Sequence, residues 1–304
     1  MCCLFGFYNY SGQPIKNLSH LTNALAEEAT VRGTDATGIA YNHKDKIVIH
    51  KEPKSAFQIN FKHPDDIISV TGHTRHSTQG NKNKNYNNHP FSGHCKNVNF
   101  ALAHNGVLTN DSKLRKELRL PNTKIETDSY VAVQLIEKKK ILNSESIKFM
   151  SENISGSFAF SILDSNNTLW LIRGDSPLSL IHIPKYKLYI YASTEEILYK
   201  ALVETKLFAE IKKGAFDEIE INSGYILNLL PNGNIVYDKF NYIDYSGFNR
   251  CHWWEYGLYS KNTNSYMDDL KSIAAHMGVS PDEIDTLAKS GFTPEEIEEY
   301  IYCL

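Results

Sequence analysis

Short hydrophobic runs alternate with a few amphipathic segments over the first 240 residues of the chain. The run from Cys3 to Tyr8 is apolar throughout and predicts a buried strand. Leucines at three- and four-residue spacing predict a helix over 15–31, with Leu18, Leu21 and Leu25 on one face. Further short strands are expected at 38–41, 47–50, 68–72 and 99–104, and helices at 127–140 and from 144 onward.

The stretch from 157 to 237 has a strong β pattern. Apolar Phe158, Phe160 and Ile162 alternate with smaller residues, and turn residues follow at 165–167. We expect hairpins around 184–186 and 231–233, and one helix over 193–205. Many strands with helices inserted in pairs favour an α+β fold of stacked sheets flanked by helices.

The character of the chain changes after residue 240. An irregular aromatic linker is expected at 241–265, followed by an acidic helical tail at 266–304 as a small C-terminal appendage. The tail holds nine acidic residues and two lysines. Its segments 278–284 and 291–297 repeat one pattern, in which Ser280 or Thr293 precedes a proline and a glutamate follows three residues later. That pattern predicts two capped short helices.

Composition narrows the class of protein. The 304 residues are 41% hydrophobic and 22% charged, which is ordinary for a folded domain and argues against general disorder. A net charge of -3 argues against nucleic acid as a partner, and no run approaches the roughly 20 apolar residues of a membrane span. Five cysteines without a C-x-x-C pair favour a reducing cytoplasm over a disulfide framework.

Five short motifs follow one another between residues 2 and 129. They are Cys2 behind a removable Met1, Arg32-Gly33-Thr34-Asp35-Ala36-Thr37-Gly38, Gly72-His73-Thr74-Arg75-His76-Ser77-Thr78-Gln79-Gly80, His104-Asn105-Gly106-Val107-Leu108, and Glu126-Thr127-Asp128-Ser129. In this order the set resembles the class II glutamine amidotransferases, which are N-terminal-nucleophile hydrolases. The resemblance covers residues 2–240 and implies a four-layer αββα sandwich.

Cys2 is the candidate nucleophile. Once Met1 is removed, its thiol and its α-amine belong to one residue, and an amine with a reference pKa of about 7.7–8.0 suits a general base. A histidine base is then not required. Taken alone, Cys2 would more often be a small apolar residue that begins a strand, and palmitoylation of Cys2 and Cys3 is a further alternative.

Arg75 and Asp128 are the candidate substrate anchors. A guanidinium binds a carboxylate through two parallel hydrogen bonds, so Arg75 would hold the α-carboxylate of L-glutamine. Asp128 would hold the α-ammonium, as its place in the fifth motif implies by resemblance. A surface ion pair for Arg75, and helix capping for Asp128, are the ordinary alternatives.

The remaining site residues rest mainly on the resemblance. Asn105 and Gly106 would donate to the developing oxyanion, although Asn-Gly is most often a turn. Arg32 and Thr78 are placed as supporting residues. His76 stands where relatives carry a larger aromatic ring, and Cys3 stands where they often carry glycine, so Cys3 is expected to be buried and structural.

Two further interpretations concern a polar loop and a group of histidines in the same region. The Asn- and Lys-rich loop at 79–88 is interpreted as an ordinary solvated loop. Histidines 73, 76, 89, 94 and 104 with Cys95 could be drawn as a metal site, but we favour no metal and no organic cofactor.

The expected function is hydrolysis of L-glutamine to glutamate and ammonia through a Cys2 thioester. Only about sixty residues follow the sandwich, so we expect a separate synthase subunit to accept the ammonia, docked through 266–304. A C-terminal cap that packs on its own chain is the equal alternative for this segment. A free-standing glutaminase is the other form of the same hypothesis. An amidase for another γ-glutamyl amide and a non-catalytic glutamine-binding regulatory subunit are the alternatives from other classes.

Overall fold

The computed structural model describes residues 2–44, 46–205, 216–242, 267, 271, 279–290, 292 and 297. The chain divides into two compact units, Met1–Tyr242 and Ile243–Leu304. The boundary expected at residue 240 lies two residues before this division. Nearly all of the predicted linker at 241–265 falls outside the described residues.

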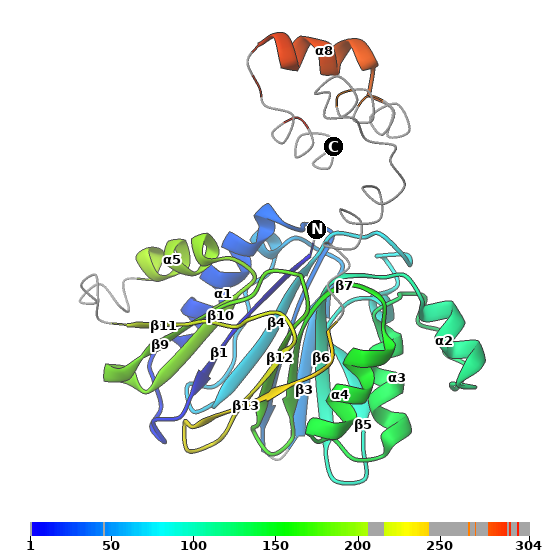
Figure 1. Ribbon diagram of the computed structural model, residues 1–304. Helices are drawn as coiled ribbons and strands as arrows, with labels where there is room; N and C mark the ends of the chain where they lie inside the picture. Colours follow the sequence, from blue (N-terminus) through cyan, green and yellow to red (C-terminus); the bar gives the residue numbers. More distant parts are fainter. Residues whose placement is uncertain are drawn as a thin grey trace. The chain divides into compact units, whose positions relative to one another are not determined.

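Two antiparallel sheets form the centre of the first unit (Figure 1). The seven-stranded sheet has the order β11-β9-β10-β1-β4-β2-β3, with β1 Cys3–Asn9, β2 Ala36–His43, β3 Lys46–Glu52, β4 Ser69–Arg75, β9 Ser179–Ile183, β10 Leu188–Ala192 and β11 Asp217–Ile219. The six-stranded sheet has the order β13-β12-β8-β7-β6-β5, with β5 Phe91–His94, β6 Asn99–Leu108, β7 Gly156–Asp164, β8 Leu169–Arg173, β12 Tyr225–Leu229 and β13 Ile235–Lys239.

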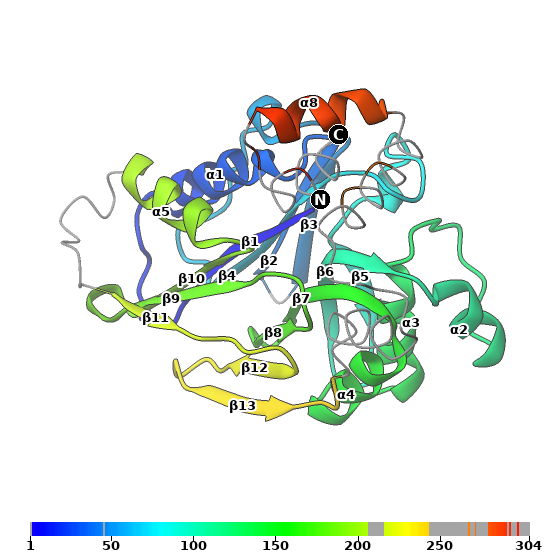
Figure 2. The ribbon, with the colours of Figure 1, turned by 45° about the horizontal axis from the view of Figure 1, so that its top comes forward.

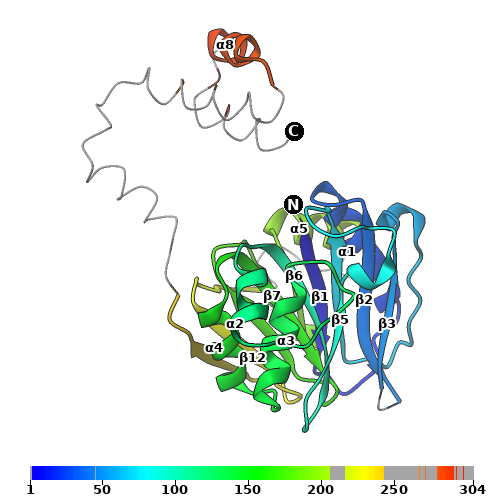
Figure 3. The ribbon, with the colours of Figure 1, turned by 90° about the vertical axis from the view of Figure 1, so that its right-hand side faces the viewer.

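Helices cover the outer face of each sheet. Helices α1 (Leu18–Glu28) and α5 (Glu195–Glu204) lie side by side over the seven-stranded sheet (Figure 2). Helices α3 (Tyr130–Lys139) and α4 (Ser144–Asn153) cover the six-stranded sheet and face the viewer in Figure 3. The shorter elements are η1 Ala29–Val31, η2 Ala56–Gln58, η3 Asn85–Asn87, α2 Asp111–Glu117 and η4 Pro184–Tyr186. The architecture is therefore the predicted α+β sandwich of four layers.

The alternation of side chains along each strand produces three hydrophobic cores, one between each pair of neighbouring layers of the sandwich. In β1, Cys3, Phe5 and Phe7 pack among the residues of α1 and α5, whereas Leu4 and Tyr8 pack between the two sheets. Successive side chains of a strand point to opposite faces, so one strand can serve two cores only if both of its faces are apolar. All seven residues of β1 are buried, as its uninterrupted apolar run predicted.

The observed elements differ from the predicted ones mainly at their ends. The helix expected from residue 127 begins at Tyr130, because residues 128 and 129 form the turn that precedes it, with the Asp128 carbonyl accepting from the Val131 amide. The helix expected from residue 15 begins at Leu18, after Asn17 in a left-handed conformation. Strands β5 and β11 and helix α2 were not predicted.

The described part of the second unit confirms one of the two predicted caps. Helix α8 (Pro281–Lys289) begins after Ser280, whose hydroxyl accepts from the Asp282 amide at 3.2 Å. Val279, Ile284 and Ile297 are buried together. The second predicted cap, at residue 293, falls outside the described residues. In the part of the chain that the structure describes, no helix is long and apolar enough to cross a membrane.

Candidate active site

Cys2 directly precedes β1 and lies beside the C-terminal end of β4. The register pairs Cys3 with Thr74 and Leu4 with His73, so one step further along the strands sets Cys2 opposite Arg75. The backbone carbonyl of Cys2 accepts from Arg32 Nε at 3.0 Å. Three of the predicted site residues therefore meet at one end of the seven-stranded sheet.

The Cys2 thiol is a partly buried group with a polar neighbourhood. Its Sγ donates to the His76 carbonyl at 3.5 Å. Burial raises the pKa of the Cys2 thiol, and the charge of Arg75 opposes that rise while the charge of Asp128 adds to it. The thiol is therefore protonated near neutral pH, and it would need a base when it attacks an amide. Among the described residues, its hydrogen-bond partner is a carbonyl and not an imidazole nitrogen.

Arg75 is buried, which excludes the surface ion pair as its role. Only 3% of the residue is exposed, and its guanidinium donates to Asn88 Oδ1 at 2.6 Å and to the carbonyls of Gln79 at 2.5 Å and Gly80 at 3.0 Å. A guanidinium has five N–H donors, so these bonds leave two for a ligand. Burial lowers the pKa of Arg75, and the charge of Asp128 opposes this.

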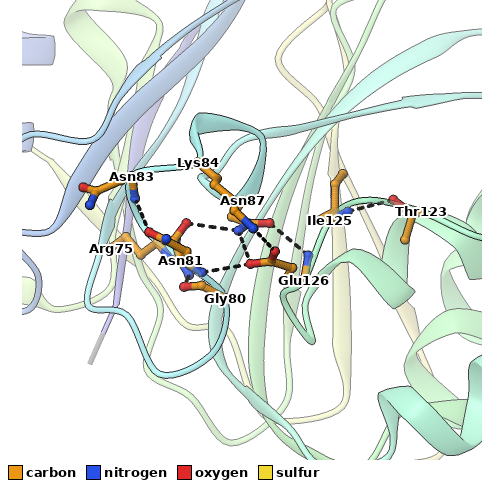
Figure 4. A network of polar contacts seen from close by, with 9 residues as sticks. All are labelled: Arg75, Gly80, Asn81, Asn83, Lys84, Asn87, Thr123, Ile125 and Glu126. Atoms are coloured by element: carbon orange, nitrogen blue, oxygen red, sulfur yellow. Dashed lines mark hydrogen bonds and ion pairs between the residues drawn. The ribbon is translucent and has the colours of Figure 1, made fainter.

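The loop at 79–88 is exposed over 81–85, as expected of a solvated loop, but it ends in two buried asparagines beside the site. Asn87 and Asn88 are buried, at 0% and 1% exposed. Glu126 binds this loop from the opposite side, accepting from the Asn81 amide at 3.1 Å and from Asn87 Nδ2 at 2.9 Å (Figure 4). Its carboxylate also pairs with Lys84, and this bond lowers the pKa of Glu126 to about 2.

Asn105 and Gly106 lie within β6, so they do not form the turn that this dipeptide usually makes. Asn105 is 2% exposed and its Nδ2 donates to Ser193 Oγ at 3.2 Å. Gly106 has a φ of 140°, and a Cβ at this position would lie 2.0 Å from the Ser157 carbonyl oxygen. Only glycine fits such a backbone and such a close approach.

Asp128 is held at the start of α3 by the strand that carries Asn105. Its Oδ2 accepts from the Leu108 amide at 2.6 Å, and Ser129 Oγ lies 3.3 Å from its Oδ1. Asp128 is 5% exposed, and its charge acts on both Cys2 and Arg75. A buried carboxylate beside a buried guanidinium is the charge arrangement that a free amino acid zwitterion needs.

Three buried imidazoles lie behind the site. The rings of His73 and His89 have centroids 4.1 Å apart, and His73 Nε2 lies 2.9 Å from the His104 carbonyl oxygen. Burial lowers the pKa of all three, that of His73 to about 3. Within the described ranges, no group of three or more ligand-type side chains could hold a metal ion. The metal-site alternative thus finds no support in these residues.

Two predicted residues have exposed side chains, and three others enter the cluster unpredicted. The side chains of His76 and Thr78 are exposed, and His76 contributes its carbonyl rather than its ring. Cys3 is fully buried, as expected. Sequence reasoning missed Asn88, Ser129 and Ser193. Only Ser129 carries a usable signal, since it belongs to the fifth motif, whereas Ser193 begins the segment 193–205 that the pattern predicts as a helix.

Comparison with known proteins supports both the fold and the family. A solved glutamine phosphoribosylpyrophosphate amidotransferase from B. subtilis, complexed with ADP and GMP, superposes with a TM-score of 0.62 at 20% identity, over 79% of this chain and 49% of that one. This likeness defines the fold as that of the N-terminal-nucleophile amidotransferases. The family described as "Glutamine amidotransferase domain" matches residues 73–200.

Curated relatives point to the same family. An isomerizing glutamine–fructose-6-phosphate aminotransferase of Listeria innocua is 34% identical over 159 residues, which are 50% of this chain and 26% of that protein. Its counterpart in Staphylococcus aureus is 32% identical over 193 residues, which are 59% of this chain and 30% of that protein. The match thus spans less than a third of each relative. Residues 73–200 thus match a glutamine amidotransferase domain, and the two-sheet sandwich around them has the fold of the solved amidotransferase.

Proposed function

We propose that this domain hydrolyses L-glutamine to glutamate and ammonia with Cys2 as the nucleophile. The observation that carries the proposal is the meeting of Cys2, Arg75 and Asp128 at one end of the sandwich, with the Asn105 amide beside them. Arg75 and Asp128 would bind the α-carboxylate and the α-ammonium. The side-chain amide of the substrate would then extend toward the thiol.

The residues of the site support the following reaction steps. Cys2 Sγ attacks the carboxamide carbon while the α-amine of Cys2, freed by removal of Met1, accepts the thiol proton. Asn105 Nδ2 and the Gly106 amide stabilise the oxyanion. Collapse of the intermediate breaks the C–N bond, and the α-ammonium returns its proton to the departing ammonia. Water then cleaves the γ-glutamyl thioester, which releases glutamate and restores the thiol.

The first experiment measures ammonia release from glutamine by the purified chain, after intact mass has shown whether Met1 is gone. We expect release by the wild type and none by Cys2→Ala. Cys95→Ala is the matched control, because Cys95 is another buried free cysteine but lies among the residues of α3 and β5. Absence of ammonia from the wild type, with or without candidate synthases, would contradict the proposal.

We also propose that the ammonia passes to a separate synthase in a reducing cytoplasm, with residues 266–304 as the docking segment. The acidic composition of this segment supports a basic docking surface on the partner. Removing 266–304 should leave ammonia release intact and abolish co-purification of the synthase. If glutamine binds without turnover, the domain is a regulatory subunit, and if another γ-glutamyl amide is cleaved faster, it is a different amidase.

A further inference from the structure

Ser193 joins the two sheets at the point where their functional residues meet. It follows β10 and is fully buried. Its hydroxyl oxygen accepts from the Leu4 amide at 2.9 Å and from Asn105 Nδ2 at 3.2 Å. Its own amide donates to the Leu4 carbonyl at 2.9 Å. One side chain therefore binds the strand that carries the nucleophile and the side chain that would bind the oxyanion.

These bonds matter because the nucleophile and the oxyanion donors belong to different sheets. Cys2 precedes β1 of the seven-stranded sheet, and Asn105 lies in β6 of the six-stranded sheet. Backbone pairing fixes positions within each sheet but not the offset between sheets, which depends on side-chain contacts. Catalysis by an oxyanion donor is sensitive to displacements of about 1 Å.

The Ser193 hydroxyl also determines how many N–H donors of the Asn105 side chain remain for a ligand. The Nδ2 group carries two N–H donors, and the bond to Ser193 uses one of them. The second remains for a substrate oxygen. Ser193 Oγ thus accepts from both the Leu4 amide and Asn105 Nδ2, which links the Asn105 side chain to the nucleophile strand.

We infer that Ser193 is a positioning residue, which sets the Asn105 amide relative to Cys2 so that it can stabilise the oxyanion. The inference rests on the proposed glutamine hydrolysis. Ser193 itself touches no substrate, and its effect on the reaction passes through Asn105.

The test compares Ser193→Ala with Ser161→Ala in the full-length chain. Ser161 is the matched control, because it is a fully buried serine whose hydroxyl also bridges the sheets, 2.5 Å from Thr71 Oγ1. We expect kcat for ammonia release to fall about 10- to 100-fold in Ser193→Ala, with KM changed less than about threefold. Ser161→Ala should lower the melting temperature to a similar extent and keep the wild-type kcat.

Two further measurements separate positioning from a general structural role. Alkylation of Cys2 by iodoacetamide develops no oxyanion, so its rate in Ser193→Ala should stay within about twofold of wild type. In the Asn105→Ala background, Ser193→Ala should cost no further activity, because residues that act through one another are not additive. If Ser193→Ala does not fold, Ser193→Cys, whose thiol is a weak acceptor, takes its place with a smaller expected loss.

Three results would overturn the inference. They are a Ser193→Ala variant with wild-type kcat, a loss confined to KM, or an equal loss in the presence and absence of Asn105. A wild type that releases no ammonia would instead overturn the proposed function and this inference with it.

Discussion

The buried imidazoles behind the site predict an acid-sensitive fold, and His89 offers the sharpest test. His89 is 4% exposed, its ring lies 4.3 Å from the Phe91 ring, and neither ring nitrogen has a hydrogen-bond partner among the described residues. Burial lowers its pKa well below the ordinary value, and the charges of His73, His104, Arg75 and Lys51 act in the same direction. The folded protein thus holds this ring neutral.

The sign and size of the effect follow from the shift. Because the folded pKa lies below the unfolded value of about 6.5, unfolding takes up a proton at acid pH, so stability is complete above that pH and is lost as the pH falls. Keeping the ring neutral in the folded state lowers the free energy of unfolding by about 0.8 kcal/mol at pH 6 and by about 2 kcal/mol at pH 5. His89→Phe removes this loss of stability. It breaks no hydrogen bond, because neither ring nitrogen of His89 has a partner among the described residues.

We therefore expect His89→Phe to gain about 1.2 kcal/mol relative to wild type between pH 6 and pH 5. Urea unfolding at both values, followed by circular dichroism, measures this difference. Any pH-independent cost of the larger ring cancels in the comparison. The exposed Val203 provides the control, since Val203→Ala changes no titratable group and should follow the wild-type pH dependence. A variant whose stability relative to wild type is the same at both pH values would refute the buried, neutral state of His89.

Three other predictions concern the site and its loop. Gly106→Ala should lose about 2–5 kcal/mol of stability in urea unfolding, because the added Cβ would overlap the Ser157 carbonyl. Gly12→Ala shares the positive φ but has open space around its Cβ, so it should lose only about 1–2 kcal/mol. Equal losses in the two variants would contradict this explanation. Arg75→Lys should raise KM for glutamine about tenfold or more, because an ammonium cannot replace the guanidinium bonds; an unchanged KM would exclude Arg75 as the anchor. Glu126→Ala should speed tryptic cleavage within the loop after β4 about threefold or more, measured by mass spectrometry; an unchanged rate would show that the carboxylate does not hold the loop.

Periodicity predicted the strands well where both faces of a strand are apolar. The apolar run at the start of the chain became the fully buried β1, and the hairpin around 184–186 joins β9 to β10. Periodicity could not predict that β1 lies between β10 and β4, because those neighbours are distant in sequence. The four-residue β5 and three-residue β11 are too short to show an alternation.

The buried end of the loop at 79–88 shows what polar composition alone does not predict. Asparagine and lysine usually indicate a solvated loop, but the Asn87 and Asn88 amides here find partners in Glu126 and Arg75. The energetic gain depends on groups from two other segments, so the loop's own sequence does not contain it. The motif residues Arg75 and Glu126 were recognised, but their bonds to this loop were not.

Neither the face that each site residue occupies nor the distance between the faces could be predicted from the sequence, because both faces of β1 are apolar. In β1, Leu4 faces the second sheet, and the two-residue period gives Cys2 the same face. The same period places Asn105 with Ala103 on the inner face of β6. The two faces meet across a shared hydrophobic core and through bonds between the sheets, among them those from His73 to the His104 carbonyl and from Asn105 to Ser193. A substitution at a bridge that contacts a site residue, such as Ser193 with Asn105, should therefore lower kcat, since it moves the oxyanion donors relative to the nucleophile, whereas the bridge from Ser161 is to Thr71.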